Sequence, residues 1–111
     1  MIIKRVKGDN YSLDIQITNE DDEAIDLTDC TVFFTVKRNI QDTDAEALIS
    51  VDITSHTSPT TGETSIPLTS TQTDIVGEFF YDVKIKTLGG TITSVIKDKI
   101  IFIENVTIRT S

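Results

Sequence analysis

Three carboxylates occupy alternate positions in the segment Asp42-Thr43-Asp44-Ala45-Glu46. Oxygen ligands at this spacing could bind Ca²⁺, but the segment lacks the glycine and the distal glutamate that a calcium-binding loop needs. We therefore expect Asp42, Asp44 and Glu46 to form a solvated acidic loop without a metal ion. The segment could also form one helical turn, with Asp42 or Thr43 as its N-cap.

The chain contains one histidine, His56, and one cysteine, Cys30. His56 lies in a loop rich in Ser and Thr, and we expect it to be exposed to solvent because lone histidines in loops are rarely ligands. Cys30 alternates with Val32 and Phe34, which favours a small buried hydrophobe over a reactive thiol. No Ser/His/Asp arrangement and no glycine-rich phosphate loop is present. The sequence therefore predicts neither an enzyme nor a cofactor-binding protein.

The composition is typical of a β-sheet protein. Thr, Ile and Val supply 43 of the 111 residues. Branching at Cβ restricts these side chains in helices but suits a pleated sheet. A chain of this length forms one domain, so we expect residues 1–111 to fold as a single unit. No apolar run is long enough to span a membrane, and we expect no secretory signal and no membrane partner.

The net charge of −8 is unevenly distributed along the chain. A negative chain repels phosphate backbones, so we expect no nucleic-acid partner. Lys and Arg are absent from residues 8–36 and from residues 39–83, which separates acidic regions from basic ones. The acidic run at residues 20–23 is expected to be a charged hairpin turn that discourages edge-to-edge strand pairing. Surfaces with both signs of charge also suit docking between protein subunits.

The longest predicted unit is a β-hairpin over residues 77–103, with Gly89 and Gly90 as its two-residue loop. Glycine tolerates the positive φ angles that such loops require. With this loop Leu88 opposes Thr91, and the register follows for both strands. The further pairs that it predicts are Phe79–Ile100, Tyr81–Asp98, Asp82–Lys97, Val83–Ile96 and Ile85–Ser94.

Two of these pairs carry charged side chains. Asp82 and Lys97 are expected to point outward as a cross-strand ion pair. Asp98 falls on the apolar face opposite Tyr81, where a carboxylate without a partner is costly. We therefore expect Asp98 to lie near the edge of the sheet or to be bonded to the tyrosine hydroxyl or to the backbone.

Shorter strands are predicted elsewhere from alternating apolar and polar residues. About seven strands with turn signals between them indicate an antiparallel β-sandwich. The expected strands outside the hairpin cover residues 2–7, 11–17, 30–36, 48–54 and 63–68, and residues 105–111 could add a last strand. The predicted core consists of Leu13, Ile15, Ile17, Val32, Phe34, Val36, Phe79, Val83, Ile85, Ile96, Ile100 and Phe102.

Combined strand and turn motifs run along nearly the whole chain. They are Lys7-Gly8-Asp9 with Tyr11-Ser12-Leu13, Ile25-Asp26-Leu27-Thr28 with Thr31-Val32-Phe33-Phe34-Thr35-Val36-Lys37, Pro59-Thr60-Thr61-Gly62, Leu68-Thr69, and Gly77-Glu78-Phe79-Phe80-Tyr81-Asp82-Val83. Together they resemble the immunoglobulin-like N-terminal domain of upper baseplate proteins of tailed phages. Closely similar small modules occur in other phage tail and virion structural proteins. The resemblance implies an immunoglobulin-like β-sandwich.

The resemblance also implies a function. It indicates a virion structural protein, made in the bacterial host cytoplasm, that docks to other virion proteins in the tail or baseplate. The same sandwich could instead be a capsid decoration protein on the phage head. A carbohydrate- or peptide-binding module is a third alternative, ranked lower because the chain has no Trp.

Alternation places Phe33 and Phe80 on the outward face of the predicted sheet. In an immunoglobulin-like sandwich their strands are neighbours, so we expect the two rings to lie close together on the surface. Aromatic anchors within a polar rim are typical of protein interfaces, which predicts a homo-oligomer or an obligate protein partner. Alternatively, residues 41–48 or the first strand could cover this patch within one chain. The other predicted members of the patch are Thr35, Lys84, Lys97, Lys99, Val95, Ile101 and Ile103.

Overall fold

The computed structural model describes residues 2–104. This part of the chain contains seven strands and two short 3₁₀ helices, and it contains no α-helix. The strands are β1 (Ile3–Val6), β2 (Tyr11–Gln16), β3 (Thr31–Lys37), β4 (Ile49–Ile53), β5 (Glu63–Leu68), β6 (Gly77–Lys86) and β7 (Ile92–Ile103). The 3₁₀ helices are η1 (Asp44–Glu46) and η2 (Pro59–Thr61). The strand suggested for residues 105–111 lies outside the described residues.

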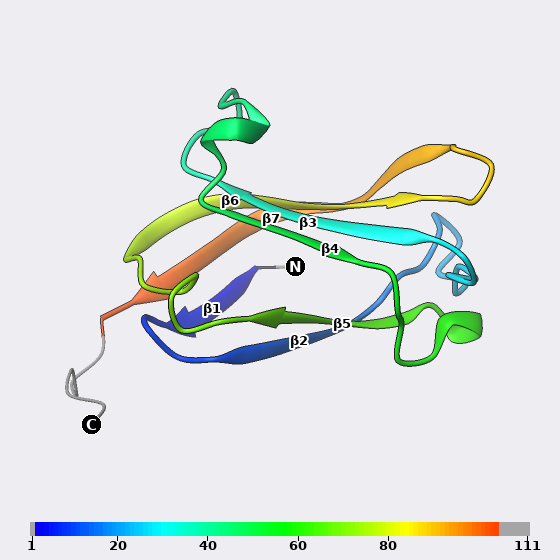
Figure 1. Ribbon diagram of the computed structural model, residues 1–111, viewed down its shortest axis with the longest axis horizontal. Helices are drawn as coiled ribbons and strands as arrows, with labels where there is room; N and C mark the ends of the chain where they lie inside the picture. The colour runs from blue at the N-terminus through cyan, green and yellow to red at the C-terminus, as the bar shows by residue number, and fades with distance from the viewer. Residues whose placement is uncertain (1, 105–111) are drawn as a thin grey trace.

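The strands form two layers that face each other (Figure 1). The larger sheet has five strands in the order β1-β7-β6-β3-β4, and the smaller sheet pairs β2 with β5. The all-β prediction is confirmed. The prediction of a purely antiparallel arrangement is wrong, because β1 pairs with β7 in parallel. The chain passes from β1 through the turn at Gly8 into the smaller sheet, so no hairpin sets the direction of β1 against β7.

Most of the predicted register of the β6–β7 hairpin is confirmed. The confirmed pairs are Phe79–Ile100, Tyr81–Asp98, Asp82–Lys97 and Val83–Ile96. Beyond Val83 the register shifts by one residue, because Val95 forms a bulge opposite β6. Ile85 therefore faces Thr93, and its predicted pairing with Ser94 is wrong.

The hairpin loop explains this shift. The Thr87 N–H donates to the Thr91 carbonyl at 2.9 Å and the Gly90 N–H donates to the Thr87 carbonyl at 2.9 Å, so the loop has three residues instead of two. Gly90 has a φ of 93°, which is the left-handed conformation that a three-residue hairpin loop places at its end. The bulge at Val95 compensates for the extra loop residue and restores the predicted register in the rest of the hairpin.

Tyr81 and Asp98 occupy the middle of this hairpin. Tyr81 is 2% exposed, and burial together with the nearby charge of Asp98 raises the pKa of its hydroxyl to about 12. The Asp98 carboxylate accepts a hydrogen bond from the Lys99 N–H at 2.8 Å. This bond to the backbone confirms the expectation for Asp98. Asp98 lies in the part of β7 that does not pair with β1.

The core lies between the two sheets. All of the predicted core residues are buried except Ile96, which is half-buried. Ile96 lines an opening between β2 and β7, because the two-stranded sheet is too narrow to cover the whole inner face of the larger one. Burying a large apolar side chain contributes about 1.5–3 kcal/mol, so this shared interior dominates the stability. The buried residues that the sequence prediction omitted include Ile3, Leu27, Ile49, Ile66 and Leu68.

Gly62 lies at one end of the two facing sheets. Its carbonyl accepts a hydrogen bond from the Ile17 N–H at 2.8 Å, and its φ is 74°. A Cβ at this position would lie 2.5 Å from the carbonyl oxygen of Ile17 and 2.9 Å from that of Ile25. Glycine is therefore required where β2, the segment after the acidic turn and η2 meet.

Candidate docking face

The outer face of the five-stranded sheet carries the predicted interface residues. Phe33 on β3 lies opposite Lys84 on β6, whereas Phe80 on β6 lies opposite Lys37 on β3. Both rings are half-buried and point away from the core. The two positions are four residues apart along β6, or about 13 Å at the usual rise of a strand. The expectation that the rings lie close together is therefore wrong, although their strands are neighbours as predicted.

The space between the two rings is occupied by polar groups. Thr35 lies opposite Asp82, and Asp82 in turn lies opposite Lys97 on β7. Two hollows open over this region, and the one beside Phe80 has a volume of about 300 Å³. Its lining residues are Thr35, Lys37, Ile40, Phe80, Tyr81, Asp82, Lys84, Ser94 and Lys97. The second hollow, of about 370 Å³, includes Phe33, so each ring borders its own concave surface.

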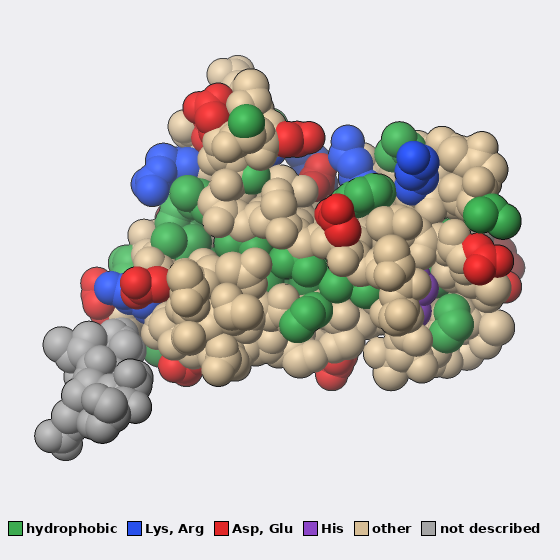
Figure 2. Space-filling view, in the orientation of Figure 1, with side chains coloured by type: hydrophobic (Ala, Val, Ile, Leu, Met, Phe, Trp, Pro, Cys, Tyr) green, Lys and Arg blue, Asp and Glu red, His purple; other side chains and the backbone are tan. Residues whose placement is uncertain are grey.

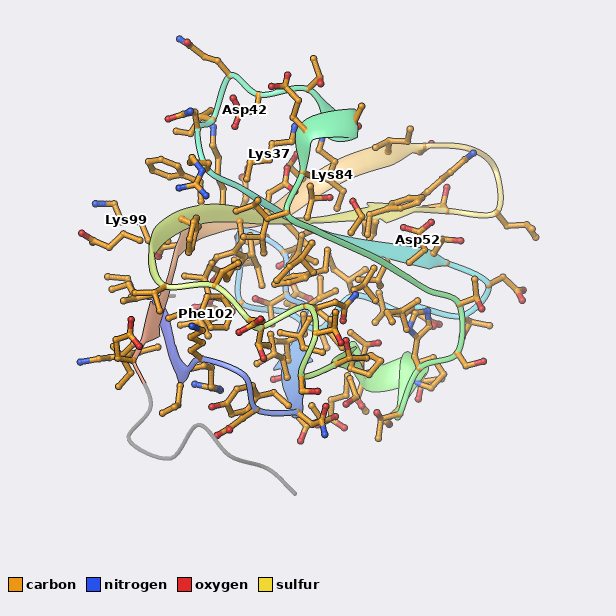
Figure 3. All side chains as sticks on the ribbon, turned by 60° about the vertical axis from the view of Figure 1, so that its left-hand side comes forward. Lys37, Asp42, Asp52, Lys84, Lys99 and Phe102 are labelled. Atoms are coloured by element: carbon orange, nitrogen blue, oxygen red, sulfur yellow. The ribbon has the colours of Figure 1, made fainter. Side chains whose placement is uncertain are left out.

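The connection between β3 and β4 forms one rim of this face. Figure 3 shows Lys37, Asp42 and Lys84 grouped beside η1 on the outer side of the sheet, with Phe102 on the inner side. Ile40 reaches the hollow beside Phe80 and is still 53% exposed. The suggestion that residues 41–48 or the first strand cover the patch is not confirmed, because β1 pairs at the edge of the sheet and the hollow remains open.

Lys37 is held by η1. Its ammonium group lies 2.8 Å from a carboxylate oxygen of Asp44. The hydrogen bond to Asp44 raises the pKa of Lys37, and the same bond lowers the pKa of Asp44. Both groups are accessible to solvent, so the pair contributes little to stability and serves to position the rim.

Four other lysines of the sheet form no ion pair within the part of the chain that the structure describes. Across residues 2–104, none of the side chains of Lys84, Lys86, Lys97 and Lys99 forms an ion pair. These four lysines, which lie on the adjacent strands β6 and β7, are called the lysine band below. Figure 2 shows Lys and Arg side chains along the upper layer and at the left end, and only acidic ones along the lower edge.

β7 contributes fewer apolar residues to the outer face than predicted. Ile101 lies on the outer face opposite Glu78, and Ile103 is 39% exposed. Val95 does not join them, because the bulge turns it toward the opening between β2 and β7. The predicted membership of Val95 in the outer patch is therefore wrong.

The acidic segment at residues 42–46 is used for local contacts. Asp42 accepts a hydrogen bond from the Asn39 N–H at 3.0 Å. Glu46 accepts one from the Thr43 hydroxyl at 3.0 Å, and Thr43 is the N-cap of η1 as predicted. Since Asp44 pairs with Lys37, the three carboxylates do not converge. Among residues 2–104 no group of three His, Cys, Asp or Glu side chains could hold a metal ion.

His56 differs from the prediction. It is half-buried and bridges two segments, with Nε2 2.8 Å from the Cys30 carbonyl and Nδ1 2.9 Å from the Thr64 hydroxyl. Because a carbonyl can only accept, Nε2 carries a proton and donates to the Cys30 carbonyl, and in the neutral ring Nδ1 accepts from the Thr64 hydroxyl. The sequence could not reveal this role, since the partners are distant along the chain. Cys30 is buried as predicted, and burial raises the pKa of its thiol.

Several lining residues of the face were not predicted. Lys37 follows Phe33 and Thr35 at alternate positions of β3, so the alternation that identified them could have included it. Ile40 lies in the connection beyond β3, where the sequence pattern gives no direction. Asp82 was predicted to point outward, but only as the partner of Lys97.

The chain matches no protein-family model, and a search of curated proteins finds no significant match. Within residues 2–104 there is no helix with the length and apolar character needed to span a membrane.

Proposed function

We propose that this chain is a phage virion structural protein that acts as a docking module of the tail or baseplate. Its work is done by protein–protein contacts and not by catalysis. The observation that carries the proposal is the outer face, where two half-buried aromatic rings border open hollows that are also lined by lysines. Aromatic groups within a charged rim are the usual composition of a protein interface.

The immunoglobulin-like character of the fold belongs to the same proposal. Seven strands in two facing layers support it, as does the long hairpin of β6 and β7, whose first strand carries one of the motifs of the family resemblance. The parallel pairing of β1 with β7 is a local variation at one edge of the larger sheet. Since such sandwiches serve many roles, the docking role is argued from the outer face and not from the fold.

Mass spectrometry of purified phage particles, separated into heads and tails, tests this proposal. We expect peptides of the chain in the tail fraction at a fixed ratio to the other tail proteins. Peptides confined to the head fraction would support the capsid decoration alternative instead. A chain that is produced during infection but absent from both fractions would contradict a structural role in the virion.

A further inference from the structure

The acidic turn between β2 and β3 is a well-defined projection. Its carboxylates are Glu20, Asp21, Asp22 and Glu23, and all four residues are exposed. Asn19 holds the turn together, because its side-chain oxygen accepts hydrogen bonds from the N–H groups of Asp21 at 2.9 Å and Glu23 at 3.0 Å. Residues 20–23 are called the acidic tip below.

The acidic tip is not neutralised within its own chain. Residues 8–36 contain no Lys or Arg, and no ion pair within residues 2–104 reaches the tip. Four adjacent carboxylates repel one another, so a cationic surface that approaches them lowers their electrostatic energy. The lysine band carries the opposite charge, and its four cations have no ion-pair partner among the described residues, although Asp44 and Asp82 line the same hollow as Lys84.

The two surfaces lie at different places on the molecule. The tip lies at the end of the molecule where the chain passes from β2 to β3 (Figure 1), whereas the lysine band lies on the outer face of the larger sheet. One chain therefore presents a positive surface and a negative surface, and no ion pair among the described residues joins them. A contact between unlike surfaces of identical chains is heterologous, and it produces rings or filaments.

We propose that the occupant of the outer face is a second copy of this chain, whose acidic tip binds the lysine band in a head-to-tail contact. This inference rests on the proposed docking role of the face and names its partner. The tip carboxylates pair with Lys84 and Lys97 at the hollow beside Phe80. Each copy in turn offers its own tip to the next one.

The contact has a defined dependence on salt. Exposed ion pairs are individually weak, so we expect association at chain concentrations of roughly 0.1–1 mM. At about 0.1 M ionic strength the Debye length is about 10 Å, which preserves contact pairs but screens the general repulsion between two negative chains. At about 1 M it is about 3 Å, and the contact should dissociate.

The test uses two variants that each remove one half of the contact. The face variant is Lys84→Glu with Lys97→Glu, and the tip variant is Glu20→Lys with Asp21→Lys. None of these side chains makes a hydrogen bond or ion pair within residues 2–104, so both variants should fold. A third variant, Lys84→Arg with Lys97→Arg, keeps the charge as a control. Sedimentation velocity at about 0.1 M salt measures the mass of each, and circular dichroism confirms folding.

We expect the wild type to grow beyond a dimer with concentration, the arginine control to behave like it, and each charge-reversal variant to be monomeric. An equimolar mixture of the face and tip variants should associate again, because the intact tip of the face variant meets the intact lysine band of the tip variant, and the two reversed surfaces are also of opposite charge. The face variant is more negative than the wild type and the tip variant is less negative. If general repulsion controlled association, the tip variant would therefore associate more strongly, which would overturn the proposal.

A wild type that stays monomeric at about 1 mM, or a mixture that does not associate, would also overturn it. These results do not affect the proposed virion role, which depends on the presence of the chain in particles. Conversely, head-to-tail association of a chain that particles lack would leave this contact standing and reject the virion role.

Discussion

Asp82 lies directly opposite Lys97 across β6 and β7, but no ion pair within residues 2–104 joins them. The register that predicted this pair is therefore correct, and the predicted ion pair is wrong. Both side chains line the hollow beside Phe80. Their separation leaves the ammonium group of Lys97 available to an acidic partner, which is what a docking face requires.

Two adjacent phenylalanines on β3 point to opposite faces of the sheet, one toward the core and one toward the outer face. Phe34 is 1% exposed and packs near Tyr81, with 5.7 Å between ring centroids, whereas Phe33 is half-buried on the outer side. We expect Phe34→Ala to lower the free energy of unfolding by about 3–5 kcal/mol, because it leaves a cavity in the core. Phe33→Ala is the matched control and should cost less than about 1.5 kcal/mol. Urea denaturation of both variants measures the difference, and equal losses would mean that the inward face is assigned wrongly.

Two glycines with positive φ provide a second matched pair. At Gly62 an added Cβ meets the backbone at 2.5 Å, whereas at Gly90 nothing lies within 4 Å of it. Gly90→Ala should cost about 1–2 kcal/mol, because only the left-handed conformation opposes it. Gly62→Ala should cost more than that, because the chain must also move away from Ile17 and Ile25. Thermal unfolding compares the two variants, and a Gly62→Ala protein as stable as Gly90→Ala would contradict the close approach.

The raised pKa of Tyr81 leads us to predict that the free energy of unfolding falls at alkaline pH. Burial holds its pKa at about 12, above the ordinary value of 10.0 for tyrosine. Below pH 10 both folded and unfolded chains keep the proton, so this stabilisation is fully present. Between pH 10 and 12 the unfolded chain ionises first, and the free energy of unfolding falls by up to roughly 2–3 kcal/mol. The Tyr81→Phe variant should not show this part of the decrease in the free energy of unfolding. A variant and wild type with parallel pH curves would show that Tyr81 does not titrate this way.

The sequence predicted the strands well, because alternation depends only on which residues face the core. Phe79, Val83 and Ile100 follow this pattern and are buried as expected. The turn was harder to predict, since Gly89-Gly90 suits loops of two or three residues, and the bulge at Val95 has no signature of its own. The direction of β1 was likewise not encoded locally.

The sequence predicted which aromatic residues lie on the candidate docking face, but not their positions relative to one another. Alternation placed Phe33 and Phe80 on the outer face, and the register between β3 and β6 then separated them. That register depends on pairing between strands more than forty residues apart, which no local pattern specifies. The bridge made by His56 escaped prediction for the same reason, because its partners Cys30 and Thr64 belong to other segments.

Labelling of lysines with an amine-reactive reagent tests most directly whether the outer face is a docking surface. The purified chain at low concentration and the assembled phage particle are labelled in parallel, and each lysine is quantified by mass spectrometry. Lys7, at the turn between β1 and β2, is the internal reference. We predict that Lys84, Lys97 and Lys99 lose most of their reactivity in the particle while Lys7 changes little. Equal labelling of these three lysines in the free and assembled chain would contradict the account.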